Sequence, residues 1–305
     1  MEAPRLLSAR TTIPVPKVVA YALGDESKSI DTFLILQYMR GEMLQSWRLK
    51  EIPVEQKQAF YESLADIFLQ LRRLEFPAIG CLTGTEDPHV GGPRTVFSID
   101  INEQEISGRN PKQIQERYMD PEGGLRSASA YTHMLLDLGD NALLGRSEIT
   151  AEQLYNMHTF REFAPGWLKP EFDREPFILT HGDFNGRNIL IDDNYNIIGV
   201  LDWEWSHTVP LQFFTPPLWL RNNNMGLMAH RSYYAFAMKE YDKFLLVVRE
   251  KEQASFSGDE ISLADEWEMA KPKGGFFVPY ALEFWTYMDW FAHDSLHFLR
   301  GGVLQ

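Results

Sequence analysis

Residues 177–205 read FILTHGDFNGRNILIDDNYNIIGVLDWEW and hold the most specific pattern in the chain. Three short apolar runs lie in this stretch, each with a polar residue at one end. Asp183 follows the first run, Asn188 opens the second, and Asp202 ends the third. If the runs are β-strands, their ends can bring these three side chains onto one rim. The pattern predicts a catalytic set; the alternative is that the three residues only form turns and cap strands.

The apolar runs predict a short β-hairpin. The expected strands are Phe177–Thr180, Asn188–Asp192 and Ile197–Leu201, with DDNYN as the turn between the second and the third. The motif His-Gly-Asp-x4-Asn would occur by chance in about two of 1,000 chains of this length. The spacing therefore favours a functional site over isolated polar residues.

A rim of carboxylate and amide oxygens suits phosphoryl transfer from ATP. The transition state of that reaction needs positioning and charge neutralisation more than covalent help. One carboxylate can accept or orient the proton of the attacking hydroxyl group. A second carboxylate and an amide oxygen can hold Mg²⁺, a hard cation that prefers oxygen ligands. The stretch therefore predicts a kinase-type reaction.

The bulk composition excludes several other classes of function. The chain has 305 residues, a formal net charge of −14 and one cysteine, Cys81. Nucleic-acid binding needs a basic face, and a cysteine zinc site or a disulfide needs more cysteines. The most apolar late stretch carries Pro279, Glu283 and Asp289, which argues against a membrane span. We expect a soluble, cytoplasmic protein with no nucleic-acid or membrane partner, and the oligomeric state stays open.

The rest of the chain predicts an α+β fold: a small β-rich N-terminal piece, then a mainly helical body that contains the hairpin. The first two strands are expected to be antiparallel, because a short polar loop joins them. The expected elements are strands Lys17–Ala22 and Thr32–Gln37, a long helix from near Pro53, an irregular segment Gly80–Gly124, and helices Ser127–Leu144, Ala151–Phe163, Arg231–Lys251, Leu263–Ala270 and Tyr280–Arg300.

HGDFNGRNILI and, after it, IIGVLDWEW resemble the catalytic and metal-binding segments of the aminoglycoside phosphotransferase family, a branch of the protein-kinase-like fold that includes choline kinases. TTIPVPKVVAY and FLILQYMRGEML resemble the loop, strand and hinge between the lobes, and PLQFFTPPLWL resembles the segment after the DWE residues in fungal-type members. The resemblance covers most of the chain. It implies a truncated β-rich N-lobe with the hinge in residues 1–42 and a large, mainly helical C-lobe in residues 43–305.

The resemblance also implies roles for single residues. Asp183 would be the catalytic base, and Asn188 and Asp202 would bind Mg²⁺. His181 would anchor the loop without acting as the base. Arg187 in the same loop could steady a phosphate or pair with an acidic neighbour, and the sequence leaves both open.

The same resemblance implies two further binding regions. The adenine of ATP or GTP would lie against the hinge backbone at Gln37, Tyr38 and Met39. The acceptor would be a small molecule, and aromatic rings with carboxylates could make a cage for a cationic one. Residues expected at this pocket are Glu204, Trp205, Trp285 and Asp289, and for the late aromatic residues a core role is the alternative.

The beginning of the sequence lacks part of the kinase pattern. A glycine-rich loop, a strand lysine and a helix glutamate normally precede the segment that TTIPVP resembles. MEAPRLLSAR has neither a glycine-rich turn nor such a strand, and we interpret it as the last turns of the helix. Three explanations are open: an incomplete sequence of an active kinase, a natural short form that has lost activity, or completion by a partner chain. The sequence thus predicts an ATP- and Mg-dependent phosphotransferase with impaired activity; the alternative is an inactive kinase-like binding or regulatory protein.

Overall fold

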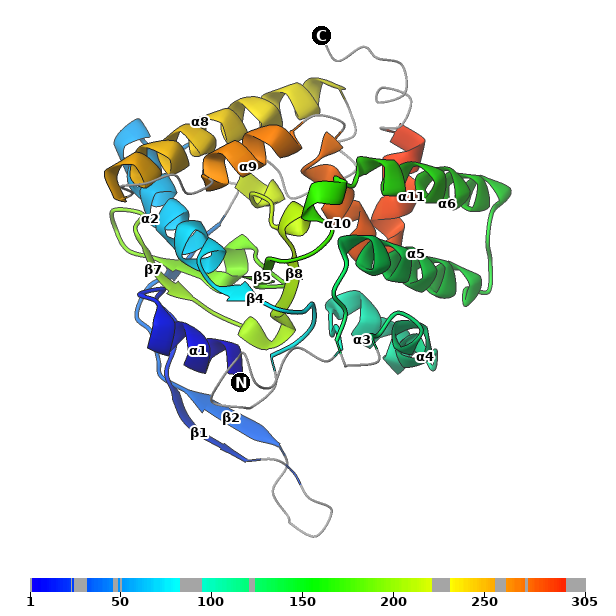
Figure 1. Cartoon of the computed structure of the whole chain (residues 1–305). Helices are drawn as coiled ribbons and strands as arrows, with labels where there is room; N and C mark the ends of the chain where they lie inside the picture. The colour runs from blue at the N-terminus through cyan, green and yellow to red at the C-terminus, as the bar shows by residue number, and fades with distance from the viewer. Residues whose placement is uncertain are drawn as a thin grey trace.

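The computed structural model describes residues 2–22, 24, 32–45, 49, 51–82, 95–120, 124–220, 231–255, 262–271 and 274–294. Its described part combines small antiparallel sheets with a mostly helical C-terminal part (Figure 1). The predicted α+β fold class is therefore confirmed. Among the described residues, no helix is both long enough and apolar enough to cross a bilayer.

The strands form three sheets in the described part of the chain, with the orders β1-β2, β3-β6-β7 and β4-β5-β8. The strands are β1 (Val18–Ala22), β2 (Phe33–Leu36), β3 (Glu42–Met43), β4 (Glu75–Phe76), β5 (Phe177–Thr180), β6 (Ile189–Ile191), β7 (Ile197–Val200) and β8 (His207–Pro210). The antiparallel pairing of β1 with β2 confirms the prediction for the N-terminal strands. The prediction of one hairpin is wrong for β5, which pairs with β4 and β8, whereas β6 and β7 do form a hairpin.

Most of the described helices follow β4 in the sequence and form the helical part of the protein. They are α1 (Glu2–Arg10), α2 (Val54–Arg72), α3 (Ile99–Ile106), α4 (Pro111–Glu116), α5 (Ala128–Leu144), α6 (Ala151–Phe163), α8 (Arg231–Ser255), α9 (Leu263–Ala270), α10 (Phe277–Glu283) and α11 (Trp285–Asp294). Side-chain caps fix several starts: Ser127 accepts from the Ala130 amide, and Thr150 forms a capping box with Gln153. Helices α3 and α4 lie inside the segment expected to be irregular.

Helix α2 packs its apolar stripe against β5 and α8. Phe60, Leu64, Ile67 and Leu71 recur at steps of four and three and are all buried, as the sequence predicts. Burial of each such side chain stabilises the fold by about 1.5–3 kcal/mol. The helix therefore supports β5, the strand that leads into the HGD segment.

The β1–β2 hairpin projects away from the helical part in Figure 1. The four apolar side chains of β2 are between 37% and 49% exposed, so both faces of this strand meet solvent. Helix α1 lies nearby and is better packed, because Ala3 and Leu7 are buried and the helix contacts residues 203–205. The N-terminal elements thus connect to the motif region through α1 and through the Pro14 carbonyl, which accepts from the Val200 amide at 2.7 Å.

The prediction of one helix over Tyr280–Arg300 is wrong for its described part. The chain forms α10 and α11, and between them Phe284 is extended, with φ −139° and ψ 121°. Both helices pack on α5, but α11 also packs along α6. Because of this break, α11 can pack along α6 while α10 packs on α5, so the two helices do not present one continuous face. Residues 295–300 lie outside the described residues.

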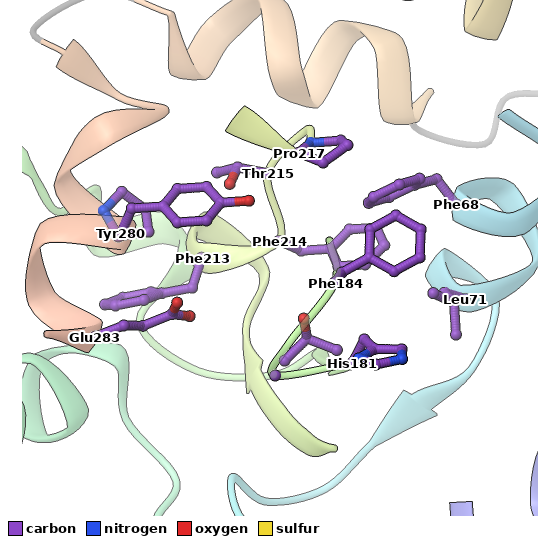
Figure 2. Close-up of a pocket in the computed structure, with 13 residues that line it drawn as sticks. Phe68, Leu71, His181, Phe184, Phe213, Phe214, Thr215, Pro217, Tyr280 and Glu283 are labelled. Carbon is purple, nitrogen blue, oxygen red and sulfur yellow. The ribbon is translucent and has the colours of Figure 1, made fainter. Parts of the chain in front are cut away.

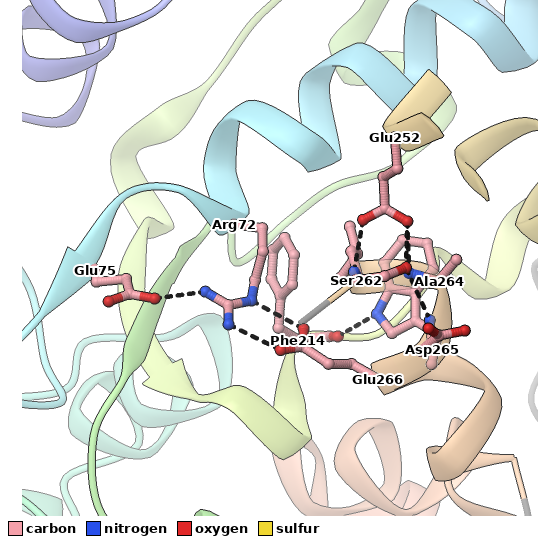
Figure 3. Close-up of polar contacts among 10 residues, drawn as sticks. Arg72, Glu75, Phe214, Glu252, Ser262, Ala264, Asp265 and Glu266 are labelled. Atoms are coloured by element: carbon pink, nitrogen blue, oxygen red, sulfur yellow. Dashed lines mark hydrogen bonds and ion pairs between the residues drawn. The ribbon is translucent and has the colours of Figure 1, made fainter. Parts of the chain in front are cut away.

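A buried ion pair joins the end of α2 to α9 (Figure 3). The Arg72 guanidinium donates from Nε and Nη2 to both oxygens of Glu266, at 2.9 and 2.8 Å, and from Nη1 to Glu75 at 2.7 Å. Glu252 holds the start of α9 by accepting from the Leu263 amide at 2.6 Å. The Glu266 carboxylate is buried, so its charge depends on Arg72 for compensation.

Replacement of Arg72 tests this dependence. Arg72→Leu should lower the free energy of unfolding by about 3–5 kcal/mol, because the Glu266 carboxylate is left buried without its cation. The double variant Arg72→Leu/Glu266→Leu should recover most of the loss. Arg249→Leu is the control, since its pair with Asp265 is exposed and should contribute at most about 1 kcal/mol. Equal losses in urea unfolding for the Arg72 and Arg249 variants would contradict the proposed dependence.

Candidate active site

The Asp183 carboxylate is oriented by two amide side chains of its own loop. Asn185 Nδ2 donates to its Oδ1 at 2.7 Å, and Asn188 Nδ2 donates to its Oδ2 at 3.0 Å. Asn188 Nδ2 also reaches the backbone oxygen of Asp183 at 2.9 Å. The two amides fix the carboxylate plane in a loop that would otherwise leave it free to rotate. The sequence analysis missed Asn185, although the Asn-Gly pair at 185–186 is typical of such turns.

Hydrogen bonds join the end of β5 to the end of β7 across two different sheets. His181 Nε2 lies 2.6 Å from the Leu201 carbonyl oxygen, and the Leu201 amide donates to the Asn188 carbonyl at 2.8 Å. Asp202 follows directly and is exposed, with a left-handed backbone at φ 58° and ψ 57°. Asp tolerates this conformation better than most residues. The contacts through Leu201 thus bring Asp202 to the side of the chain where the Asp183 loop lies.

His181 is held as a neutral ring. Burial lowers its pKa to about 4, because the charged form would lose its hydration. The hydrogen bonds agree with this state: Nε2–H donates to Leu201, and Nδ1 accepts from the Asp183 amide at 3.3 Å. Its ring centroid lies 4.5 Å from that of Trp203. A neutral, enclosed imidazole of this kind suits the role of an anchor better than that of a base.

The oxygen donors of Asn188 and Asp202 are of the type that a magnesium ion prefers, and neither residue lines the cleft described below. The Nδ2 of Asn188 is used by Asp183, whereas its Oδ1 has no hydrogen-bond donor among the described residues. The exposed carboxylate of Asp202 is the second hard oxygen group. The described residues contain no cluster of three or more His, Cys, Asp or Glu side chains that could hold a metal. Mg²⁺ is commonly held by one or two carboxylates with water and phosphate, so such a cluster is not needed.

Asp183 opens onto a cleft of about 520 Å³. Asp183 and Arg187 lie on the loop side of the cleft, and Arg187 has no ion pair with a described residue. The segment after β8 and the late helices contribute aromatic side chains to the lining, namely Trp219, Tyr280, Phe284 and Tyr287. The cleft therefore combines a polar rim with a largely apolar wall.

Residues 2–211 match the phosphotransferase enzyme family, APH. The chain belongs to this family. Two solved structures of its fold span the chain almost completely. A thermostable mutant of aminoglycoside phosphotransferase APH(4)-Ia, in a ternary complex with AMP-PNP and hygromycin B, is 13% identical, covers 100% of this chain and 83% of its own, and has a TM-score of 0.52. A second structure of APH(4)-Ia is 14% identical, covers 99% and 82%, and has the same TM-score.

The similarity to APH(4)-Ia shows that the α+β layout described above is the kinase-like fold of these phosphotransferases. At 13–14% identity it shows the fold alone. Comparison with curated proteins gives no match.

The hinge residues expected from the family resemblance come directly after β2. The Gln37 amide donates to the Lys17 carbonyl at 2.8 Å, which continues the β1–β2 pairing by one step. The Tyr38 side chain is 86% exposed. The backbone of Met39 has no hydrogen bond to a described residue, and its methyl group lies over Gly199 of β7. The hinge backbone is thus open to a ligand, and its role as an adenine site stays a prediction.

None of the four residues expected at the acceptor pocket is among the described residues that line the cleft. Trp205 stacks on Phe97, with ring centroids 5.2 Å apart, and Glu204 beside it is exposed. The structure does not bring Trp285 and Asp289 to the cleft: the Trp285 ring lies under the Arg146 guanidinium at 5.1 Å, and Asp289 accepts from the Asn156 side chain at 2.7 Å. The break at Phe284 is the reason, because α11 follows α6. Tyr280, Glu283 and Tyr287, which the sequence analysis missed, face the cleft instead.

The buried state of His181 predicts a pH dependence of stability. Its pKa is about 4 in the folded protein and about 6.5 in the unfolded chain, so the unfolded chain binds more protons between these values. Its contribution to stability is therefore present above pH 6.5 and lost as the pH falls toward 4. His181→Gln cannot titrate and should remove about 2 kcal/mol of the loss in unfolding free energy between pH 7 and pH 5. The exposed His158→Gln should leave the pH dependence as in wild type; an unchanged slope for His181→Gln would contradict the assignment.

The conformation of Gly182 leads to a second prediction, which concerns the packing of the HGD loop against the segment after β7. Its φ is 76°, and a Cβ at this position would collide with the Trp205 carbonyl group. Gly182→Ala should lower the free energy of unfolding by about 2–4 kcal/mol, from the left-handed backbone and the steric overlap together. Gly166→Ala is the control, because a Cβ there meets no atom within 4 Å. Chemical denaturation of both variants measures the difference. Equal stability would show that the backbone around Gly182 can move to accept a methyl group without a loss of unfolding free energy.

Proposed function

We propose that the protein is an ATP- and Mg²⁺-dependent phosphotransferase that acts on a hydroxyl group of a small molecule. The observation that carries this proposal is the Asp183 carboxylate, which two amides orient at the rim of the cleft. Family membership supports the reaction type. The AMP-PNP and hygromycin B bound by the similar APH(4)-Ia structure support an adenine nucleotide and a hydroxylated acceptor for this chain.

We assign the roles in this reaction to the residues that the sequence analysis expected. Asn188 and Asp202 would hold Mg²⁺, which supplies charge neutralisation at the transferred phosphoryl group. The adenine would lie at the backbone of residues 37–39, and GTP is the alternative nucleotide. In this proposal residues 1–42 form the smaller lobe with the hinge, and residues 43–305 form the helical lobe. His181 supports the loop, and the guanidinium of Arg187, which lines the cleft and has no ion pair with the described residues, is available to a phosphate oxygen.

The chemical step requires one proton transfer by the chain itself. The acceptor hydroxyl loses its proton to the Asp183 carboxylate as the bond from its oxygen to the γ-phosphorus forms and the bond from that phosphorus to the bridging oxygen breaks. Asn185 and Asn188 each occupy one lone pair of the carboxylate, so the remaining lone pairs are directed. A positioned base of this kind typically contributes about 10²–10⁴ in rate.

Thermal stabilisation by nucleotide tests the proposal without requiring turnover. MgATP should raise the Tm of the wild-type chain. Asp202→Asn should abolish the Mg²⁺-dependent part, because one carboxylate ligand is lost while Asn still tolerates the left-handed backbone. Asp183→Asn should keep the nucleotide effect and lower any phosphoryl transfer by about 10²–10⁴.

Asp193→Asn serves as the matched control, since this aspartate is exposed in the turn between β6 and β7. It should behave as wild type in both measurements. If neither MgATP nor MgGTP stabilises the wild-type chain, and Asp202→Asn has the same Tm profile, the kinase assignment fails. The inactive binding or regulatory protein would then be the better interpretation.

A further inference from the structure

Glu283 lies at the inner end of the cleft, where α10 ends. It lines both the main cleft and a smaller cavity of about 70 Å³ that continues inward beneath the HGD loop. Figure 2 shows Tyr280 and Glu283 entering this cavity from one helix, opposite Phe184 and His181. No hydrogen bond or ion pair joins the Glu283 carboxyl group to a described residue. A carboxyl group in such a place is free to contact a ligand.

The surroundings of Glu283 disfavour its charged form. Burial raises its pKa to about 8, and no cation of the described residues offsets this effect. The titratable groups that line the two cavities with Glu283 or interact with it are Tyr131, His181, Asp183, Arg187, Tyr280 and Tyr287. Burial also raises the pKa values of the three tyrosines, and His181 is neutral, so Arg187 across the cleft is the one cation of this group. At pH 7 the Glu283 side chain is thus mainly a carboxylic acid, which can donate a hydrogen bond.

The charge of the cleft wall argues against a polycationic acceptor. The charged types among its described lining residues are Asp183, Arg187 and Glu283, and one of these is a cation. The uncharged polar side chains of the lining are Gln45, Asn185 and the two tyrosines, and most of the remaining wall is aromatic or aliphatic. Each ammonium group of a polyamine would need its own carboxylate or water to replace its hydration. An uncharged body loses less hydration and gains apolar contact with the rings.

We propose that the acceptor is an uncharged small molecule with an aromatic or other apolar body, whose carbonyl or ether oxygen accepts a hydrogen bond from the Glu283 carboxylic acid. This proposal rests on the proposed function for the hydroxyl group that faces Asp183. It makes Glu283 a residue that determines acceptor specificity. The net charge of −14 over the whole chain does not oppose it, because the wall of this cleft carries few of those charges.

Binding of matched probes in the absence of nucleotide tests the proposal. The probes are para-hydroxyphenylacetone, which has a ketone, tyramine, which has an ammonium group on a similar ring, and hygromycin B, which is polycationic. We expect the ketone to bind most tightly at pH 7 in ligand-detected NMR titrations. Its affinity should fall about fivefold or more as the pH rises through about 8, because a carboxylate cannot donate to a ketone oxygen.

Three variants separate the hydrogen bond from the fold. Glu283→Gln keeps a neutral donor and should bind the ketone within about twofold of wild type, with no change between pH 6 and pH 9. Glu283→Leu should weaken binding about fivefold at pH 7. The exposed Glu162→Gln of α6 is the control, and the Tm of each variant reports its folding.

Several results would overturn the proposal. These are absence of ketone binding, tighter binding of tyramine or hygromycin B at pH 7, or a ketone affinity that Glu283→Leu leaves unchanged. None of them depends on MgATP. The nucleotide titrations with Asp202→Asn can therefore fail or succeed independently, which keeps a failure of the acceptor assignment distinct from a failure of the proposed reaction.

Discussion

The position of the candidate site depends on one hydrogen bond between two sheets, from the His181 ring to the Leu201 carbonyl. Strand β5 belongs to the β4-β5-β8 sheet and β7 to the β3-β6-β7 sheet, so no continuous ladder sets the distance between their ends. The buried imidazole bridges this gap by donating from Nε2–H to Leu201, and as a neutral ring it also accepts from the Asp183 amide at Nδ1. The close packing of Gly182 against the Trp205 carbonyl is a second contact between the segments that follow β5 and β7.

The two sides of the cleft contribute different chemistry because they come from different kinds of element. The strand ends carry short polar side chains, and the hydrogen bonds that the Asn188 side chain donates to Asp183 leave little freedom to either residue. The helices α10 and α11 contribute large rings that fill space without fixed polar geometry. In the proposed function, the loop sets the positions of the reacting groups, and the helices set the shape of the ligand that can bind.

The sequence predicted the loop well and the helical wall poorly, for a physical reason. The loop is local: its turn residues and apolar strands lie within 30 residues of each other. Strands β4 and β8 pair with β5 from about 100 and 30 positions away, and β4 has two residues, too few for any period. In the late segment, Tyr280, Glu283 and Tyr287 have the spacing of one helical face. Nothing in that spacing says which face meets the cleft, and the break at Phe284 is set by packing on α5 and α6.

Two carboxyl groups at one cleft are placed in opposite environments, and this contrast bears on its chemistry. Asp183 is partly exposed and accepts from two amides, an environment in which a carboxylate keeps both water and hydrogen-bond donors. Glu283 lies beside tyrosine rings without an ion pair to a described residue, and burial raises its pKa, which favours its protonated form. In the proposed function one carboxyl group takes a proton and the other donates a hydrogen bond, although both are carboxylic acids. Counting acidic residues in the sequence would treat them as equivalent, and only their packing distinguishes the two environments.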